Sequence, residues 1–311
     1  MEKKSKMNNF RSDLAVEICS DLWANDSELS GIECKKDRRG SLDLETVVIK
    51  SPEGAALAGK PVGTYITVSC GKLWLEHREK IREKLFEFRD LIRPLIAPKN
   101  CKSILVAGLG NEGITADAIG PLAVKNLIVT RHIRSERPQI FEHLGLFDLC
   151  AVTPGVLGQT GIESADVIRS IVERVRPDLL IVIDALASRD LSRLVNTIQI
   201  SDSGISPGSG IGNSRPSLSP EELGIPMISF GVPTVVDAAT LAADAIHSFS
   251  EQETDSDAIR KEWSKNGLNF FVTPKETDQI IRVLASFIGH GINLALNRQL
   301  SYEDMLSLAG G

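Results

Sequence analysis

The sequence predicts an α/β fold with a mostly parallel central sheet, helices on both faces and a strand-rich N-terminal part. Short apolar runs alternate with helical patterns along the middle of the 311-residue chain, which is typical of parallel sheets. The composition, 42% hydrophobic and 24% charged, is that of an ordinary globular protein. A chain of this length can bury a sizeable core, so we expect one α/β domain over residues 14–311.

The N-terminal quarter predicts a polar leader followed by strands. Residues 1–13 have little to bury, so we expect them to be disordered. Strand-like segments follow at 46–49 and 63–69, between turns rich in Gly and Pro, in a strand-rich part that spans 14–75. Residues 76–93 have apolar side chains spaced 4, 3 and 4 apart, which predicts a helix that ends before Pro94.

The central and C-terminal parts predict alternating strands and helices. Expected strands are 103–107, 179–183, 197–200 and 227–230. Expected helices are 122–129, a helix opened by a capping box at 160–163 and ending near 175, and 237–249. The charged stretch 250–262 is expected to be an exposed insertion. A second capping box at 273–276 predicts a long apolar terminal helix over 274–297.

Charge, hydropathy and cysteine usage exclude several classes of protein. The formal net charge of −6 argues against a direct nucleic-acid partner. No apolar run approaches the roughly 18 residues of a membrane span, and the polar N-terminus lacks the apolar region of a secretory signal. Five widely spaced cysteines without a C-x-x-C motif predict reduced thiols in a cytoplasmic protein.

A glycine-rich loop follows the expected strand 103–107. Gly108, Gly110 and Gly113 have the G-x-G-x-x-G spacing of dinucleotide-binding loops. The pattern lacks two features of such loops: a helix that begins at the glycines, and an acidic residue about 20 positions later. The pattern therefore does not favour a bound dinucleotide, and we expect no cofactor. A dinucleotide-dependent oxidoreductase is kept as an alternative.

Three aspartates, Asp117, Asp184 and Asp237, follow expected strands. In open α/β sheets, ligands and catalysis collect beyond the carboxyl ends of the strands. Two carboxyl groups held close together share one proton, which gives one acid and one base, as peptide hydrolysis requires. Each aspartate could instead cap a helix or fix a turn, an interpretation that suits Asp237 best and Asp184 least. Two such aspartates in one glycine-lined cleft make a non-catalytic binding module less favoured.

Metal and nucleophile sites are not predicted. The five histidines show neither H-x-x-x-H nor H-E-x-x-H spacing, and no G-x-S-x-G motif marks a nucleophilic serine.

The chain resembles the spore germination protease family, endopeptidases that degrade small acid-soluble spore proteins when bacterial endospores germinate. The resemblance is carried by RSDLAVE (11–17), GKPVGTYITV (59–68), VAGLGNEGITADAIGPLAVKNLIVTRH (106–132), PGVLGQTGIESADVI (154–168), PDLLIVIDALASR (177–189), TIQISDSGISPGSGIGN (197–213) and LGIPMISFGVPTVVDAAT (223–240). It implies that Asp117 and Asp184 are catalytic, that the protein forms a homotetramer and that it works in the cytoplasm of the spore core. Ala116 departs from the family pattern, which has proline before the aspartate.

The family's fold is similar to that of hydrogenase-maturation endopeptidases, which use a metal bound by acidic residues and a histidine. The corresponding acidic positions here are Asp117 and Asp184, with no matching histidine. We therefore expect no metal, and a metal-dependent maturation peptidase is kept as an alternative on the same fold.

The resemblance also implies a zymogen that removes its own N-terminal segment. The family's cleavage motif is an acidic residue, an apolar residue, alanine, any residue and glutamate. Residues 13–17 fit this order, so we predict a propeptide of residues 1–13 and cleavage between Asp13 and Leu14. Alternatively, the alternating apolar residues Leu14, Val16 and Ile18 could form a first strand that fixes the segment to the sheet.

Overall fold

The computed structural model describes residues 12–17, 31–97, 101–205, 216–250, 256–266 and 268–309. Strands are β1 (Ile32–Arg39), β2 (Leu42–Ile49), β3 (Gly63–Ser69), β4 (Ser103–Gly108), β5 (Asp148–Val152), β6 (Leu179–Ser188), β7 (Thr197–Ser201), β8 (Met227–Asp237) and β9 (Phe271–Val272). Helices are α2 (Pro52–Ala58), η1 (Leu73–Leu75), α3 (Arg78–Ile96), η2 (Thr115–Asp117), α4 (Ile119–Lys125), α5 (Arg131–Glu136), α6 (Pro138–His143), α7 (Leu157–Thr160), α8 (Ser164–Val175), α9 (Pro220–Leu223), α10 (Ala238–Ser250), α11 (Ser256–Lys265), α12 (Thr277–Leu296) and α13 (Tyr302–Ala309).

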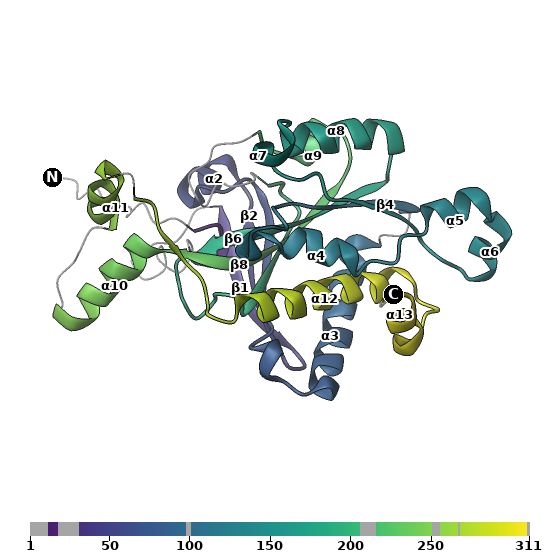
Figure 1. Ribbon diagram of the computed structural model, residues 1–311, viewed down its shortest axis with the longest axis horizontal. Helices are drawn as coiled ribbons and strands as arrows, with labels where there is room; N and C mark the ends of the chain where they lie inside the picture. The colour runs from purple at the N-terminus through teal and green to yellow at the C-terminus, as the bar shows by residue number, and fades with distance from the viewer. Residues whose placement is uncertain are drawn as a thin grey trace.

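One sheet organises the molecule, with strand order β1-β2-β3-β7-β8-β6-β4-β5 and with β9 paired to β8. Helices lie on both faces: in Figure 1, α3 and α12 lie below the sheet and α8 lies above it. The predicted α/β class with helices on both faces is confirmed.

The sheet is mixed, which differs from the expected mostly parallel sheet. Strands β5, β4, β6 and β8 are parallel neighbours, whereas β1, β2, β3 and β7 join through antiparallel pairs. The connection from β1 to β2 is two residues long and that from β6 to β7 spans residues 189–196. A parallel crossover needs a dozen or more residues, so these short connections favour antiparallel pairing. The strand-rich N-terminal part thus extends the same sheet.

The largest hydrophobic cluster fills the space between the sheet and α3, α4 and α12. Phe88 is fully buried there and packs on Phe230 and Phe287, with ring centroids 6.3 Å and 5.0 Å apart. Helix α12 is long and apolar enough to cross a membrane by length and composition, but 72% of its apolar window is buried inside the protein. Its hydropathy is therefore accounted for by its place in the core.

The opposite face carries two smaller clusters. One joins β4 and β6 to α8 through Leu105, Leu180, Ile168 and Ala165. The other joins β1, β2 and β3 to α2 and to Leu14, Ala15 and Val16. Residues 12–17 thus pack against the sheet, with a helical turn at 15–17 in place of the alternative strand. Residues 1–11 of the predicted propeptide lie outside the described residues.

Several helix boundaries differ from the expected ones. Helix α3 continues through Pro94 to Ile96, because a proline in the last turn removes only one helical hydrogen bond. Neither capping box forms: Thr160 ends α7 and Gly161 adopts a left-handed conformation, so α8 begins at Ser164. Helix α12 begins at Thr277, with Glu276 as its N-cap residue.

The stretch 250–262, expected to be an exposed insertion, contains the start of a docked helix. Residues 251–255 lie outside the described part of the chain. Residues 256–265 form α11, where Ser256 is buried and the Arg260 side chain is paired with Asp237. The buried ion pair fixes this helix to the end of β8.

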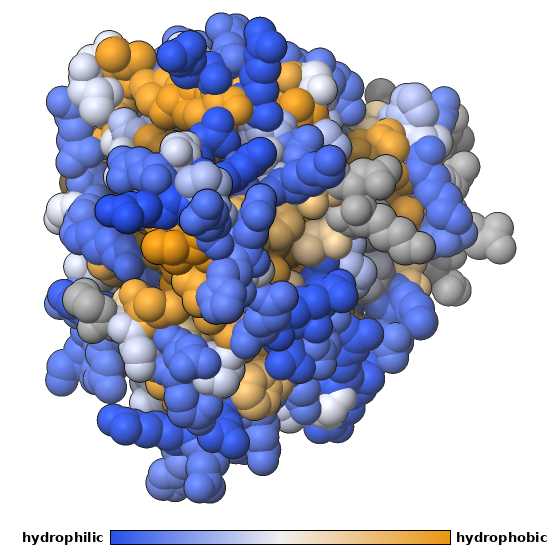
Figure 2. Space-filling view, turned by 90° about the vertical axis from the view of Figure 1, so that its right-hand side faces the viewer, coloured by the Kyte–Doolittle hydropathy of each residue, from blue (hydrophilic) through white to orange (hydrophobic). Residues whose placement is uncertain are grey.

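The end of the molecule that carries α5 and α6 shows apolar patches among charged residues (Figure 2). Ile140 and Leu144, in and directly after α6, are about half exposed. Apolar exposure of this extent is ordinary for a folded chain, since polar groups do not suffice to cover its surface.

Candidate active site

The glycine-rich loop after β4 is shaped by close backbone packing. A Cβ at Gly108 would clash with the carbonyl group of Gly120, and one at Gly110 would clash with the carbonyl oxygen of Asp117. Gly110 also has a φ of 110°, which a side chain would strain. The glycines therefore bring the end of β4 against η2 and α4, and they place Asp117 at this edge of the sheet.

This loop differs from a dinucleotide-binding loop. Helix α4 begins at Ile119, after η2 and six residues beyond Gly113, so it does not open on the glycines. The Asp117 carboxylate turns back on the loop, where its Oδ2 accepts a hydrogen bond of 2.8 Å from the backbone N–H of Asn111. The backbone N–H groups that a pyrophosphate would need are partly used in this way.

Asp184 lies inside β6 and not after its end, because this strand continues along β8 to Ser188. It follows Ile183, the last residue of β6 that pairs with β4. Its side chain is 9% exposed, and its Oδ1 accepts a hydrogen bond of 2.9 Å from the N–H of Ala185. Burial raises the pKa of Asp184 well above its ordinary value, and the negative charges of Asp117 and Asp13 raise it further. Asp117 and Asp13 are thus both close enough to Asp184 for their charges to act on its carboxyl group.

Asp237 has a different role. It ends β8, is 2% exposed, and its Oδ1 accepts a hydrogen bond of 3.0 Å from the N–H of Ala239 at the start of α10. Its Oδ2 accepts a hydrogen bond of 2.6 Å from Nε of Arg260. These contacts agree with the capping interpretation, and Asp237 is not among the charges that raise the pKa of Asp184.

Residues 12–17 lie beside Asp184, and several contacts hold Asp13 in place. Its N–H donates to the carbonyl oxygen of Ala187 at 2.9 Å, and its Oδ2 accepts from the N–H of Ala187 at 2.9 Å. The Nζ of Lys60 lies 3.9 Å from its Oδ1. Burial lowers the pKa of the Lys60 ammonium group, and the negative charges of Asp13 and Glu17 offset part of this lowering.

Glu17 anchors the other end of this segment. Its carboxylate oxygens accept hydrogen bonds of 2.8 Å and 3.0 Å from the backbone N–H groups of Arg189 and Asp190, and Ser12 also donates to it. Burial raises the pKa of Glu17, and these hydrogen bonds oppose the rise. A hollow of about 500 Å³ adjoins Glu17 and is lined by Arg189, Arg193 and Asp244 among others. The two acidic positions of the cleavage motif are therefore the ones that the structure holds most firmly.

Gln199 is a site residue that the sequence analysis missed. It lies on β7 and is 7% exposed, and its side chain bonds to both Asp13 and Ala15 of the docked segment. Glutamine is rarely buried, and its place between two isoleucines in TIQIS was the one available signal.

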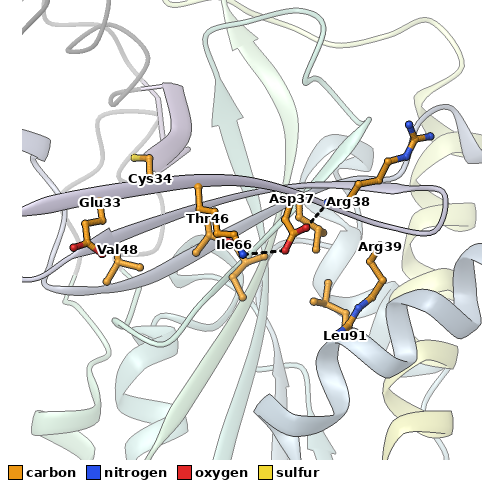
Figure 3. Close-up of a pocket in the computed structure, with 11 residues that line it drawn as sticks. Glu33, Cys34, Asp37, Arg38, Arg39, Thr46, Val48, Ile66 and Leu91 are labelled. Atoms are coloured by element: carbon orange, nitrogen blue, oxygen red, sulfur yellow. Dashed lines mark hydrogen bonds and ion pairs between the residues drawn. The ribbon is translucent and has the colours of Figure 1, made fainter.

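A second hollow, of about 640 Å³, lies on the antiparallel half of the sheet (Figure 3). Its lining comes mainly from β1 and β2, with Ile66 of β3 and Leu91 of α3. Figure 3 shows that the Asp37 carboxylate is already bound there, to Lys35 Nζ at 3.2 Å and to the Arg38 N–H at 2.8 Å. This hollow brings no two carboxyl groups together for proton sharing, so it is a poorer candidate than the Asp117–Asp184 site.

The residues described by the structure do not fit a metal ion. Among them, no three His, Cys, Asp or Glu side chains are grouped so that they could hold one. Protein metal sites generally need three or more such ligands. We therefore derive no chemical step through a metal.

Comparisons with known proteins find germination proteases. A family model described as germination protease matches residues 11–251. The germination protease of Caldanaerobacter subterraneus is 41% identical over 96% of this chain and 98% of its own length, and that of Clostridium acetobutylicum is 38% identical over the same shares. The germination protease of Bacillus velezensis is 35% identical over 95% of each chain. These matches support a peptidase and give no support to a dinucleotide-dependent oxidoreductase.

Among solved structures, the NiFe hydrogenase maturation protease HycI of Thermococcus kodakarensis is similar with a TM-score of 0.36 and 15% identity. The similarity covers 67% of this chain and 97% of that one.

Proposed function

The chain belongs to the germination protease family and is a peptidase, and we propose that Asp117 and Asp184 carry out its hydrolysis as a pair that shares one proton. The observation that carries this proposal is the placement of the two carboxyl groups: Asp184 is buried, and Asp117 is close enough for its negative charge to act on it. Two carboxyl groups in such a place cannot both be ionised cheaply, so the protonated form of one of them is favoured.

The two carboxyl groups take different roles in this proposal. Asp184 is the acid, because burial disfavours its charged form. Asp117 is the base, because the hydrogen bond from Asn111 favours its carboxylate. Asp117 takes a proton from water as the water oxygen bonds to the carbonyl carbon of the peptide. Asp184 gives its proton to the leaving nitrogen as the C–N bond breaks, and a proton transfer from Asp117 to Asp184 restores the pair.

We propose small acid-soluble spore proteins as the substrates, the cytoplasm of the spore core as the site of action, and a homotetramer as the assembly. These three statements rest on the family to which the chain belongs.

We also propose that the chain is made as a zymogen and cuts itself between Asp13 and Leu14. The docked segment supports this, because Asp13 is one of the charges that act on Asp184. Leu14 is fully buried, so the uncut segment also covers this part of the sheet against other substrates. Cleavage would free residues 1–13 and would leave the new N-terminus at Leu14.

Two measurements test the proposed function. The first incubates the purified chain with a small acid-soluble spore protein and maps the cut by mass; we expect cleavage after an acidic residue that is followed by an apolar residue and alanine. The second determines the N-terminal sequence after storage under mildly acidic, dehydrating conditions, where we expect a new terminus at Leu14 that is absent in D184N. Intact spore protein contradicts the substrate proposal, and a persistent Met1 or a cut elsewhere contradicts the self-cleavage.

A further inference from the structure

We propose that Gln199 is a catalytic residue: its carboxamide binds the carbonyl oxygen of the peptide bond that is cut and stabilises the negative charge that forms on this oxygen. The inference rests on the proposed peptidase function and on docked residues 12–17 as an occupant of the substrate site. It adds a third group to the two aspartates.

The hydrogen bonds of Gln199 span the Asp13–Leu14 bond. Its Nε2 donates to the carbonyl oxygen of Asp13 at 3.1 Å, and its Oε1 accepts from the N–H of Ala15 at 2.8 Å. Both bonds are buried, so water competes little with either of them. One side chain therefore holds the peptide on both sides of the predicted cut.

Gln199 and Asp184 lie in the same row across the sheet. Both pair in register with Gly231 of β8, Asp184 from β6 and Gln199 from β7. Residues in one row point to the same face, and neighbouring strands are about 4.8 Å apart, so their Cα atoms are about 10 Å apart. Gly231, between them, has no side chain, and the Leu186 side chain occupies the space that a Cβ there would need.

The docked segment bridges the two ends of this row. The N–H and side chain of Asp13 bond to Ala187 on β6, and its carbonyl oxygen bonds to Gln199 on β7. Downstream, the backbone N–H groups that hold Glu17 follow β6 directly. The segment is thus fixed before and after the Asp13 carbonyl group, and this anchoring gives the Gln199 contact a defined geometry.

A carboxamide suits an oxygen that becomes negative. Attack of water on the carbonyl carbon moves an electron pair onto the carbonyl oxygen, and a preorganised N–H donor in a buried site stabilises this charge. An amide neither gains nor loses a proton near neutral pH, so Gln199 does not replace either aspartate. The proton for the leaving nitrogen still comes from Asp184.

Two substitutions separate the two hydrogen bonds of Gln199. Q199A removes both, whereas Q199E keeps the size and the acceptor for Ala15 but loses the donor to Asp13 near neutral pH. The readouts are the rate at which the full-length chain gains a terminus at Leu14 and the rate at which it cleaves a small acid-soluble spore protein. We expect both variants to lose about 10²–10³-fold in both rates, as for removal of one oxyanion donor.

The pH dependence of Q199E distinguishes catalysis from structure. A protonated glutamic acid regains an O–H donor, so the ratio of the Q199E rate to the wild-type rate should rise as the pH falls. The ratio is used because the other ionisable groups around the docked segment, Asp13, Glu17, Lys60, Asp117 and Asp184, are present in both proteins. A deficit that does not change with pH would mean that Gln199 is only structural and would overturn the inference.

Thr67 provides a matched control. It is the residue of β3 that pairs with Gln199, it is buried, and its Oγ1 has no hydrogen-bond partner. T67V keeps the shape of this side chain, and we expect both rates to stay unchanged. An equal loss in T67V and Q199A would assign the effect to the strand pair and overturn the inference.

The remaining outcomes separate this inference from the proposed function. A wild-type chain that cleaves neither itself nor a spore protein overturns the proposed function, and the role of Gln199 with it. A fully active wild type with fully active Q199A and Q199E overturns the role of Gln199 alone. If Q199A does not fold by circular dichroism, Q199E decides, because it preserves the size of the side chain and one of its two bonds.

Discussion

The sheet face that packs on α3 and α12 is filled by aliphatic and aromatic side chains such as Phe88 and Phe230, whereas the opposite face carries Asp184, Gln199 and the docked residues 12–17. The first face gains stability by removing apolar area from water. The second face buries a carboxyl group whose pKa is raised by that burial, which costs stability. The main hydrophobic core and the proposed catalytic groups thus lie on opposite faces of one sheet.

The largest expected effect lies on the face with the carboxyl groups. We expect D117N and D184N each to lower the rate of peptide cleavage about 10²–10⁴-fold, since each removes a general acid or base. The fold should persist, as checked by circular dichroism. The matched control is D43N, which changes an exposed aspartate of β2 in the antiparallel half. Near-normal turnover of either site variant removes that residue from the mechanism.

Substitutions on the sheet face that packs on α3 and α12 should lower the stability of the fold. We expect F88A to lower the free energy of unfolding by about 3–5 kcal/mol, because it leaves a cavity between α3, α12 and β8. Denaturant unfolding measures this loss, and cleavage per folded molecule should be retained. L75A, at a side chain that is 71% exposed, is the control and should change the stability little. Loss of activity in folded F88A would mean that the two faces are not independent.

The pH dependence of stability tests the cost of burying Asp184. Its pKa in the folded state lies above that in the unfolded state, so the folded state holds the proton more tightly. The contribution of Asp184 to stability is therefore greatest below the unfolded pKa, and it falls as the pH rises through the folded pKa.

The D184N variant isolates this contribution, because asparagine does not titrate. We expect the Tm of D184N to exceed that of the wild type by a difference that grows from acidic toward neutral pH. Thermal unfolding of both proteins across this range measures the difference. A constant difference, or a lower Tm for D184N at neutral pH, contradicts the account of Asp184 as a destabilising group.

The smallest expected effect concerns α2, which packs with the docked segment. The Oγ of Ser51 caps this helix by accepting a hydrogen bond of 3.2 Å from the N–H of Gly54. We expect S51A to lower stability by about 1 kcal/mol and to speed or slow self-cleavage measurably. The control is S219A, which removes the corresponding N-cap of α9. This helix packs against the hydrophobic cluster that joins β4 and β6 to α8. S219A should lower stability by about the same amount as S51A without changing the rate of self-cleavage. If S219A and S51A change this rate equally, α2 has no special link to residues 12–17.

Local patterns were sufficient for several elements. The apolar runs 103–107 and 179–183 correspond to β4 and to the first half of β6, and the amphipathic stripe of 76–93 corresponds to α3. Asp117 follows β4 as expected, whereas Asp184 was expected after a strand and lies inside β6, because this strand continues to Ser188 along β8. The capping boxes misled the prediction of helix starts, because Gly161 ends α7 and because Glu276 is itself the N-cap residue of α12.

The sequence by itself determined the α/β class, the place of Asp117 in the loop after β4, and the motif at residues 13–17. Each depends on neighbours within a few positions of the chain. The tertiary structure alone decided that β1, β2, β3 and β7 join the sheet antiparallel, and that Gln199 meets Asp13 across 186 positions. Strand order and burial depend on contacts between distant segments, and no local pattern of residues specifies which distant segments will meet.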